Sequence, residues 1–229
     1  MKVVDAVSKY LTESAVDASE QEVEILNLLD RIQGYADVGD LTPQFILNPF
    51  CREYVDLEFA ELPQRRSNTH GRALAVKDSL TVFFRWAQCE VGLEDLEGLE
   101  KALDEVCATI PRAVEIAALL NEVSSARRGG FGFPEFLTSF EDGGRSSYDL
   151  DAPGKSGTRG GYFRVKSATG LETVLEHSAS GELVAPVELP FEIATLISEG
   201  FILDLELLFK DGRWVVYDNG IVYPPSVQV

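Results

Sequence analysis

The sequence predicts an α+β protein in which an N-terminal all-α helical bundle precedes a small C-terminal β-barrel. Up to about residue 127, nearly every stretch has the apolar spacing of an amphipathic helix. Residues 129–161 are then rich in Gly and Ser, and short alternating stretches with hairpin signals follow. We therefore expect a helical domain over residues 1–128, a connecting segment with many Gly, Ser and aromatic residues over 129–160, and a barrel domain over 161–229.

The helical half contains recognisable helix ends. Ser19 and Glu22 form a capping-box pattern, and Gly34 ends the helix that follows it. Thr42-Pro43 and Asn48-Pro49 are N-cap and proline pairs that favour new helix starts. Together with the apolar periodicity, these signals predict helices over residues 2–13, 20–33, a short stretch from 43, 49–62, 68–91, 93–108 and 111–126.

The C-terminal part alternates in the manner of short strands. Ser180-Gly181, Asp211-Gly212 and Asn219-Gly220 are hairpin turn signals between these strands. The predicted elements are strands 162–166, 171–177 and 183–189, a helix from Pro190 to Glu199, and strands 201–209, 213–217 and 221–223. Counted by its main elements, this is β-β-β-α-β-β, which resembles the order of an oligonucleotide-binding (OB) barrel with its helix after the third strand.

The composition excludes several classes of protein. Thirty-eight acidic residues against 20 basic residues give a net charge of −18, which repels nucleic acid and anionic membranes at long range. No stretch approaches the roughly 18 apolar residues of a membrane-spanning helix, and the N-terminus lacks the pattern of an export signal. Three widely spaced cysteines predict free thiols. We expect a soluble cytoplasmic protein that binds no membrane; its oligomeric state stays open.

No motif predicts a metal, a cofactor or a catalytic centre. His70 and His177 lie far from any cysteine, whereas a structural zinc site needs about four Cys or His ligands at close spacing. Gly154-Lys155-Ser156 lacks the glycine that a phosphate-binding loop needs five positions earlier, where Asp149 stands. We expect no cofactor and no enzymatic activity. An enzyme with a dispersed site, invisible in the sequence, is the third alternative for function.

The basic residues are segregated along the chain. Ten of the 20 lie in three short segments, near residues 65–77, at 127–128 and near 155–166, with Tyr162 and other aromatic residues nearby. Aromatic and basic residues together are typical of surfaces that bind single-stranded nucleic acid. The candidate residues for binding nucleic acid or another partner are Arg65, Arg66, His70, Arg72, Lys77, Arg127, Arg128, Lys155, Arg159, Tyr162, Arg164 and Lys166.

Residues 3–92 resemble the SAM-like core-binding domain of tyrosine recombinases. The resemblance depends on the opening helix around Val7–Leu11, the helix start at Leu41-Thr42 and the late helix with Phe83-Phe84-Arg85-Trp86-Ala87. It implies that the late helix packs the bundle and that basic residues near it lie on DNA. However, residues 1–62 carry 13 acidic and four basic residues, and no Arg, His-x-x-Arg and Tyr set of a recombinase catalytic domain follows.

We therefore expect a non-enzymatic binding or adaptor protein. In the leading version it associates with nucleic acid through the basic segments. In the alternative it is a protein-binding regulator or assembly factor, whose acidic helical faces meet a basic partner and whose charge accelerates association.

Overall fold

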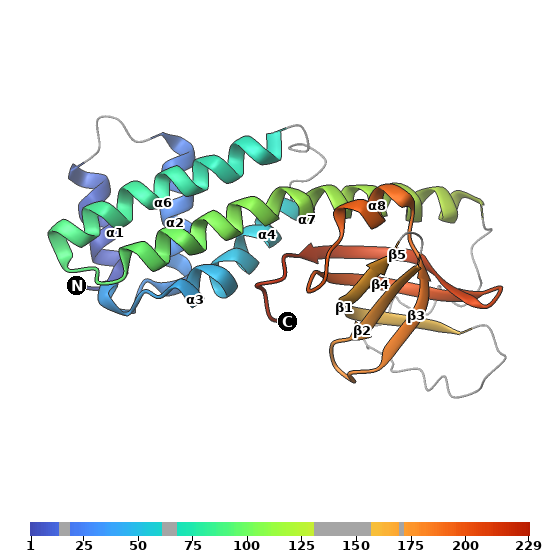
Figure 1. Cartoon of the computed structure of the whole chain (residues 1–229). Coiled ribbons are helices and arrows are strands. Elements are labelled where there is room, and N and C mark those ends of the chain that lie inside the picture. Colours follow the sequence, from blue (N-terminus) through green and yellow to red (C-terminus); the bar gives the residue numbers. More distant parts are fainter. Residues whose placement is uncertain (14–18, 61–67, 131–156, 170–171) are drawn as a thin grey trace, which may run out of the picture. The chain divides into compact units, whose positions relative to one another are not determined.

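The structure, a computed structural model, describes residues 1–13, 19–60, 68–130, 157–169 and 172–229. Helices form the N-terminal part and a five-stranded sheet the C-terminal part, as predicted (Figure 1). The chain divides into two compact units. The helical unit is Met1–Val114 with Tyr223–Gln228, and the sheet unit is Glu115–Val222 with Val229. The C-terminal residues Tyr223–Gln228 thus pack with the helices, although the first of them, Tyr223, is the last residue of β5.

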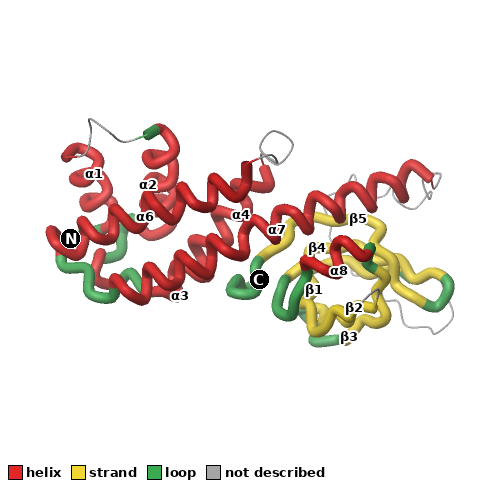
Figure 2. Tube along the Cα trace, turned by 45° about the horizontal axis from the view of Figure 1, so that its top comes forward, coloured by secondary structure: helices red, strands yellow, loops and turns green. Residues whose placement is uncertain are grey.

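The helical unit is built from five α-helices and the start of a sixth within the described residues. Helices α1, α2 and α6 contact one another, and Figure 2 shows them side by side. A π-helical segment, η2 (Ile46–Phe50), joins α3 to α4. The elements are α1 (Val3–Glu13), α2 (Glu20–Gln33), the 3-10 turn η1 (Val38–Asp40), α3 (Pro43–Phe45), α4 (Cys51–Ala60), α6 (Thr69–Val91) and the first part of α7 (Leu96–Gly130).

Aromatic side chains hold α1 against α6. The ring of Tyr10 meets Phe83 and Trp86 edge-on, with centroid distances of 5.5 and 5.4 Å. Both Tyr10 and Phe83 are buried. Edge-to-face pairs contribute about 0.5–1.5 kcal/mol beyond the burial of their area, so this cluster fixes the position of the first helix.

The predicted helix ends of α2 and α6 are confirmed, but the capping box is only half formed. The Ser19 Oγ accepts a hydrogen bond from the Glu22 N–H at 3.1 Å. The Glu22 carboxylate accepts a hydrogen bond from the Tyr10 hydroxyl at 2.9 Å instead of one from the Ser19 backbone N–H. Gly92 ends α6 with a left-handed φ of 82°.

The prediction of two helices over residues 93–108 and 111–126 was wrong, because one continuous helix, α7, covers both. Pro111 lies inside it. Proline has no N–H to donate to the carbonyl of Cys107. For this reason proline is normally found in the first turn of a helix, where no such hydrogen bond is needed. Here Ile110, Ala113 and Val114 on either side are buried, so tertiary packing maintains the helix through the proline.

The sheet unit contains β1 (Thr158–Thr169), β2 (Glu172–His177), β3 (Leu183–Glu188), β4 (Ile202–Lys210) and β5 (Arg213–Tyr223), with α8 (Phe191–Leu196) between β3 and β4. The N-terminal part of β1 pairs with β4 and its C-terminal part with β2, both antiparallel. Strands β3 and β5 are parallel, through Val187 opposite Trp214 and Glu188 opposite Val215. The strand order β1-β2-β3-β5-β4 therefore closes on itself.

The predicted turn at Asn219-Gly220 was also wrong, because β5 runs through it without interruption. The Asn219 side chain is used for packing instead: Ser124 of α7 donates to its Oδ1 at 3.0 Å, and its Nδ2 donates to the Ala117 carbonyl at 3.5 Å. A Cβ on Gly220 would lie 2.3 Å from the Asp204 carboxylate. These two residues thus serve close packing rather than a change of direction.

Gly161 gives the first prediction. Its φ is +137°, and a Cβ there would lie 2.9 Å from His177 Nε2. Gly161→Ala should lower the free energy of unfolding by about 1–3 kcal/mol, the usual range for such a strained backbone, as measured by chemical denaturation. Gly39→Ala, whose Cβ would meet nothing within 4 Å, should change it by less than about 0.5 kcal/mol. In the double variant Gly161→Ala with His177→Ala, the free energy of unfolding should recover only the part that was lost to the steric clash with His177.

The cysteines give the second prediction. Burial raises the pKa of both Cys51 and Cys107 from 9.0 to about 12, whereas Cys89 is exposed. At pH 8 an aromatic disulfide reagent should react quickly with one thiol per chain and with three after unfolding. Because these two pKa values are raised in the folded state, their stabilising contribution is complete below pH 9 and should disappear between pH 9 and about 12. Fast reaction of all three thiols in the native protein would contradict this.

Candidate functional site

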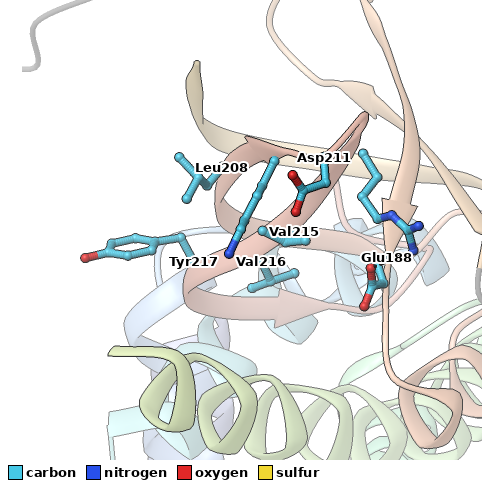
Figure 3. Close-up of a pocket in the computed structure, with 8 residues that line it drawn as sticks. Glu188, Leu208, Asp211, Val215, Val216 and Tyr217 are labelled. Atoms are coloured by element: carbon cyan, nitrogen blue, oxygen red, sulfur yellow. Dashed lines mark hydrogen bonds and ion pairs between the residues drawn. The ribbon is translucent and has the colours of Figure 1, made fainter. Parts of the chain in front are cut away.

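A groove lies on the sheet unit beside the hairpin that joins β4 to β5. Its volume is about 280 Å³. Figure 3 shows side chains of β4 and β5 around it, with Glu188 from the end of β3. The lining residues are Glu188, Leu208, Lys210, Asp211, Arg213, Val215, Val216 and Tyr217.

The hairpin turn determines which side chains line the groove. Asp211 and Gly212 have φ values of 52° and 82°, the left-handed conformation that a two-residue hairpin requires. Side chains alternate between the two faces of a strand, so Leu208, Val215 and Tyr217 share the face that looks away from the sheet interior. All three are half-buried. They give the groove an apolar floor that solvent still reaches.

Charges of both signs surround this floor. The Arg213 guanidinium donates to Glu188 at 3.0 Å and so joins the groove edge of β5 to the end of β3. Lys210, at the end of β4, and Asp211, in the turn, are exposed. With two carboxylates and two cations, the groove has no excess of either sign.

A cation–aromatic cluster is formed by Arg159, Phe209, Trp214 and Glu182. The Arg159 guanidinium lies 5.3 Å from the centroid of Trp214, and the Phe209 ring contacts the same indole at 5.2 Å. Arg159 also forms an ion pair with Glu182 and lowers the pKa of that carboxyl, chiefly through their hydrogen bond. This arginine therefore already has an aromatic and an anionic partner.

The candidate residues on α6 differ in their surroundings. Arg72 forms an ion pair with Glu58 of α4 at 2.5 Å, and the two side chains are only 14% and 2% exposed. Lys77 lies 2.7 Å from Asp104, and the hydrogen bond to this carboxylate raises the pKa of the lysine. His70 is exposed. The ion pair between Arg72 and Glu58 thus joins α6 to α4.

Strand β1 does not gather its candidate residues on one face. Arg159 lies on the same face of β1 as buried Phe163 and Val165, whereas Tyr162 and Arg164 lie on the opposite face. Arg164 donates to the carbonyl of Gly200 at 3.2 Å. Lys166 lies 3.2 Å from Glu176.

The other candidate residues are not characterised by the structure. Arg65, Arg66 and Lys155 lie outside the described residues, and so does most of the predicted connecting segment. Arg127 and Arg128 belong to α7, where only their backbone is described.

The groove residues are not predicted as a site from the sequence. Asp211-Gly212 is recognisable in the sequence as a hairpin turn. Leu208 and Lys210 are two residues apart, as are Arg213 and Val215, and this spacing was the signal that could have placed each pair on one face of its strand. The contribution of Glu188 depends on the parallel pairing of β3 with β5, which the local sequence does not reveal.

Within the described ranges, no three His, Cys, Asp or Glu side chains gather as a metal ion would require. In the same residues, no helix combines the length and apolar character that a membrane crossing needs. No family model, curated protein or solved structure matches this chain.

The Arg72–Glu58 pair gives the third prediction. Arg72→Ala should lower the free energy of unfolding by about 3–5 kcal/mol, because it leaves a buried carboxylate without its partner. Arg85→Ala, on the same helix, breaks the exposed pair with Glu100 and should cost no more than about 1 kcal/mol. Thermal or urea unfolding of both variants tests the comparison. Equal losses would show that the buried pair has no special role.

Proposed function

We propose that this chain is a binding or adaptor protein whose partner is another protein rather than a nucleic acid. The observation that carries the proposal is that four of the described candidate cations pair with carboxylates of the same chain, while Arg164 donates to the carbonyl of Gly200. Arg72, Lys77, Arg159 and Lys166 each have such a partner.

These pairs disfavour contact with a phosphate backbone. Exposed ion pairs are weak, so a phosphate could displace the carboxylate at little cost. The displaced carboxylate would nevertheless remain nearby and repel the phosphate. In a chain of net charge −18 this repulsion has little to offset it, because nucleic-acid affinity depends on a net positive face.

We further propose that the sheet unit is an OB-type barrel. The order of its elements, the closed strand order and the parallel pairing of β3 with β5 support this assignment. In this fold, oligonucleotides bind over the second and third strands. Here, Glu172, Glu176 and Glu188 occupy these strands, and Glu172 lies opposite Glu188. The acidic character of these strands again favours a protein partner over a nucleic acid.

The groove has the chemistry of a small protein interface. An apolar floor from Leu208, Val215 and Tyr217 can accept an aliphatic side chain, and flanking charges of both signs suit the polar groups beside it. The negative charge of the whole molecule would attract a basic partner and increase its association rate. The partner that fits best is a protein segment in which aliphatic and basic residues alternate. The resemblance of residues 3–92 to a recombinase core-binding domain stays a prediction.

The fourth prediction tests this preference with three labelled probes: an alternating Lys-Leu decapeptide, an alternating Glu-Leu decapeptide and a single-stranded thymidine oligonucleotide. In fluorescence anisotropy at low salt, the Lys-Leu peptide should bind, and its affinity should fall as salt rises. The other two probes should not bind. Oligonucleotide binding with a steep salt dependence would overturn the proposal in favour of nucleic acid.

Two variants with the same change of charge locate the binding surface. Val215→Lys places a cation on the groove floor, and Val82→Lys places one on the exposed face of α6. Val215→Lys should lower the affinity for the Lys-Leu peptide at least about tenfold, which corresponds to about 1.4 kcal/mol of binding free energy. Val82→Lys should have a much smaller effect. Equal weakening by both variants would mean that only long-range charge acts and that the groove is not the site.

A further inference from the structure

The C-terminal segment, residues Tyr223–Gln228, belongs to the helical unit and lies on it as a bound peptide would. Tyr223 is only 2% exposed, and its hydroxyl donates to Asp56 Oδ1 at 2.7 Å. Val227 is fully buried. The Gln228 N–H donates to Asn48 Oδ1 at 2.9 Å. The segment is thus held by one aromatic side chain, one aliphatic side chain and two hydrogen bonds to side chains of the helical unit.

The segment also has a compact local structure. The Val227 N–H donates to the Pro224 carbonyl at 3.2 Å and closes a four-residue turn. Pro225 occupies the second position of that turn, where the fixed φ of proline is favourable. A segment with a preformed turn loses less conformational entropy on docking than a flexible one.

The surface beneath the segment comes from η2 and α4. Asn48 lies in η2, the π-helical segment that also contains Pro49. Such segments occur frequently at functional sites. Cys51 and Asp56 follow in α4. The Cys51 thiol is fully buried, and Ser226 of the C-terminal segment lies close enough to it to lower its pKa against the larger effect of burial. The reactivity of this thiol therefore reports whether the segment is in place.

We propose that η2 and α4 form a peptide-binding site that the chain fills with its own C-terminal segment. A partner protein would occupy the same site by displacing it, with a segment of the same chemistry: a tyrosine, a proline turn and an aliphatic residue. This rests on the proposed function only in that the partner is a protein, and it does not involve the groove on the sheet unit. Covalent attachment gives the C-terminal segment a high effective concentration, so the site is closed to weak competitors in the unmodified chain.

The experiment uses the full chain with a weakened C-terminal segment. Tyr223→Ala removes the buried ring and its hydrogen bond to Asp56. A labelled heptapeptide of sequence Tyr-Pro-Pro-Ser-Val-Gln-Val should bind this variant at least about tenfold more tightly than it binds the unmodified chain. The same peptide with phenylalanine in place of tyrosine should bind the variant more weakly. Val229→Ala, next to the segment, should leave binding unchanged.

Thiol labelling supplies a second readout with an internal control. Cys107 is buried elsewhere in the helical unit, where its thiol donates to the Ala73 carbonyl. In the Tyr223→Ala variant, iodoacetamide should modify Cys51 at least about tenfold faster than in the unmodified chain, as the segment opens locally. Cys107 should stay protected, and added heptapeptide should slow the Cys51 reaction.

Two outcomes would overturn the inference. One is peptide affinity that is the same for the variant and the unmodified chain. The other is a parallel increase in the reactivity of Cys51 and Cys107, which means that the helical unit unfolds rather than releases a ligand. If Tyr223→Ala fails to fold, Tyr223→Phe removes only the hydroxyl and allows the same two measurements. Neither outcome bears on whether the Lys-Leu peptide binds the groove. The proposal for the groove and the proposal for the η2 and α4 site can therefore fail independently.

Discussion

Ion pairing between a few cations and an excess of carboxylates shapes both units of this molecule. In the helical unit, Arg72 and Glu58 join α4 to α6 in a nearly dry environment. In the sheet unit, Arg213 and Glu188 join β5 to β3 across the parallel pairing. The same pairing decides the chemistry of the surface, because each paired cation has a carboxylate beside it that would repel an external phosphate. Stability and the proposed partner preference therefore have a common electrostatic origin.

The features that were predicted correctly from the sequence are those that neighbouring residues determine. Ser19 as an N-cap, Gly92 at a helix end and Asp211-Gly212 in a hairpin need only their neighbours. The errors arise where distant packing prevails: Pro111 remains inside a helix because Ile110 and Val114 are buried, and Asn219 stays in a strand because Ser124 bonds to it. The order of helices and strands was therefore largely predictable, whereas several boundaries were not: β1 is longer than the predicted 162–166, and α8 ends at Leu196 rather than at Glu199.

The candidate site was less predictable than the fold for the same reason. Basic residues that are close in sequence looked like one patch, yet Arg72 is drawn toward buried Glu58, and Arg159 lies on the face of β1 opposite Arg164. Strand alternation could have separated the last two. The position of Glu58 relative to Arg72 depends on how α4 and α6 pack, which charge patterning does not reveal. The groove also needed the pairing of β3 with β5 before Glu188 could join it.

Strand β5 leads directly into the C-terminal segment, and this continuity has a mechanical consequence. A force applied at Val229 would first load the Gln228–Asn48 hydrogen bond and then the Tyr223–Asp56 hydrogen bond. Only afterwards would it reach the ladder of β5. The two side-chain hydrogen bonds would therefore break before the strands separate. The strands would not experience forces that are too small to break these two bonds.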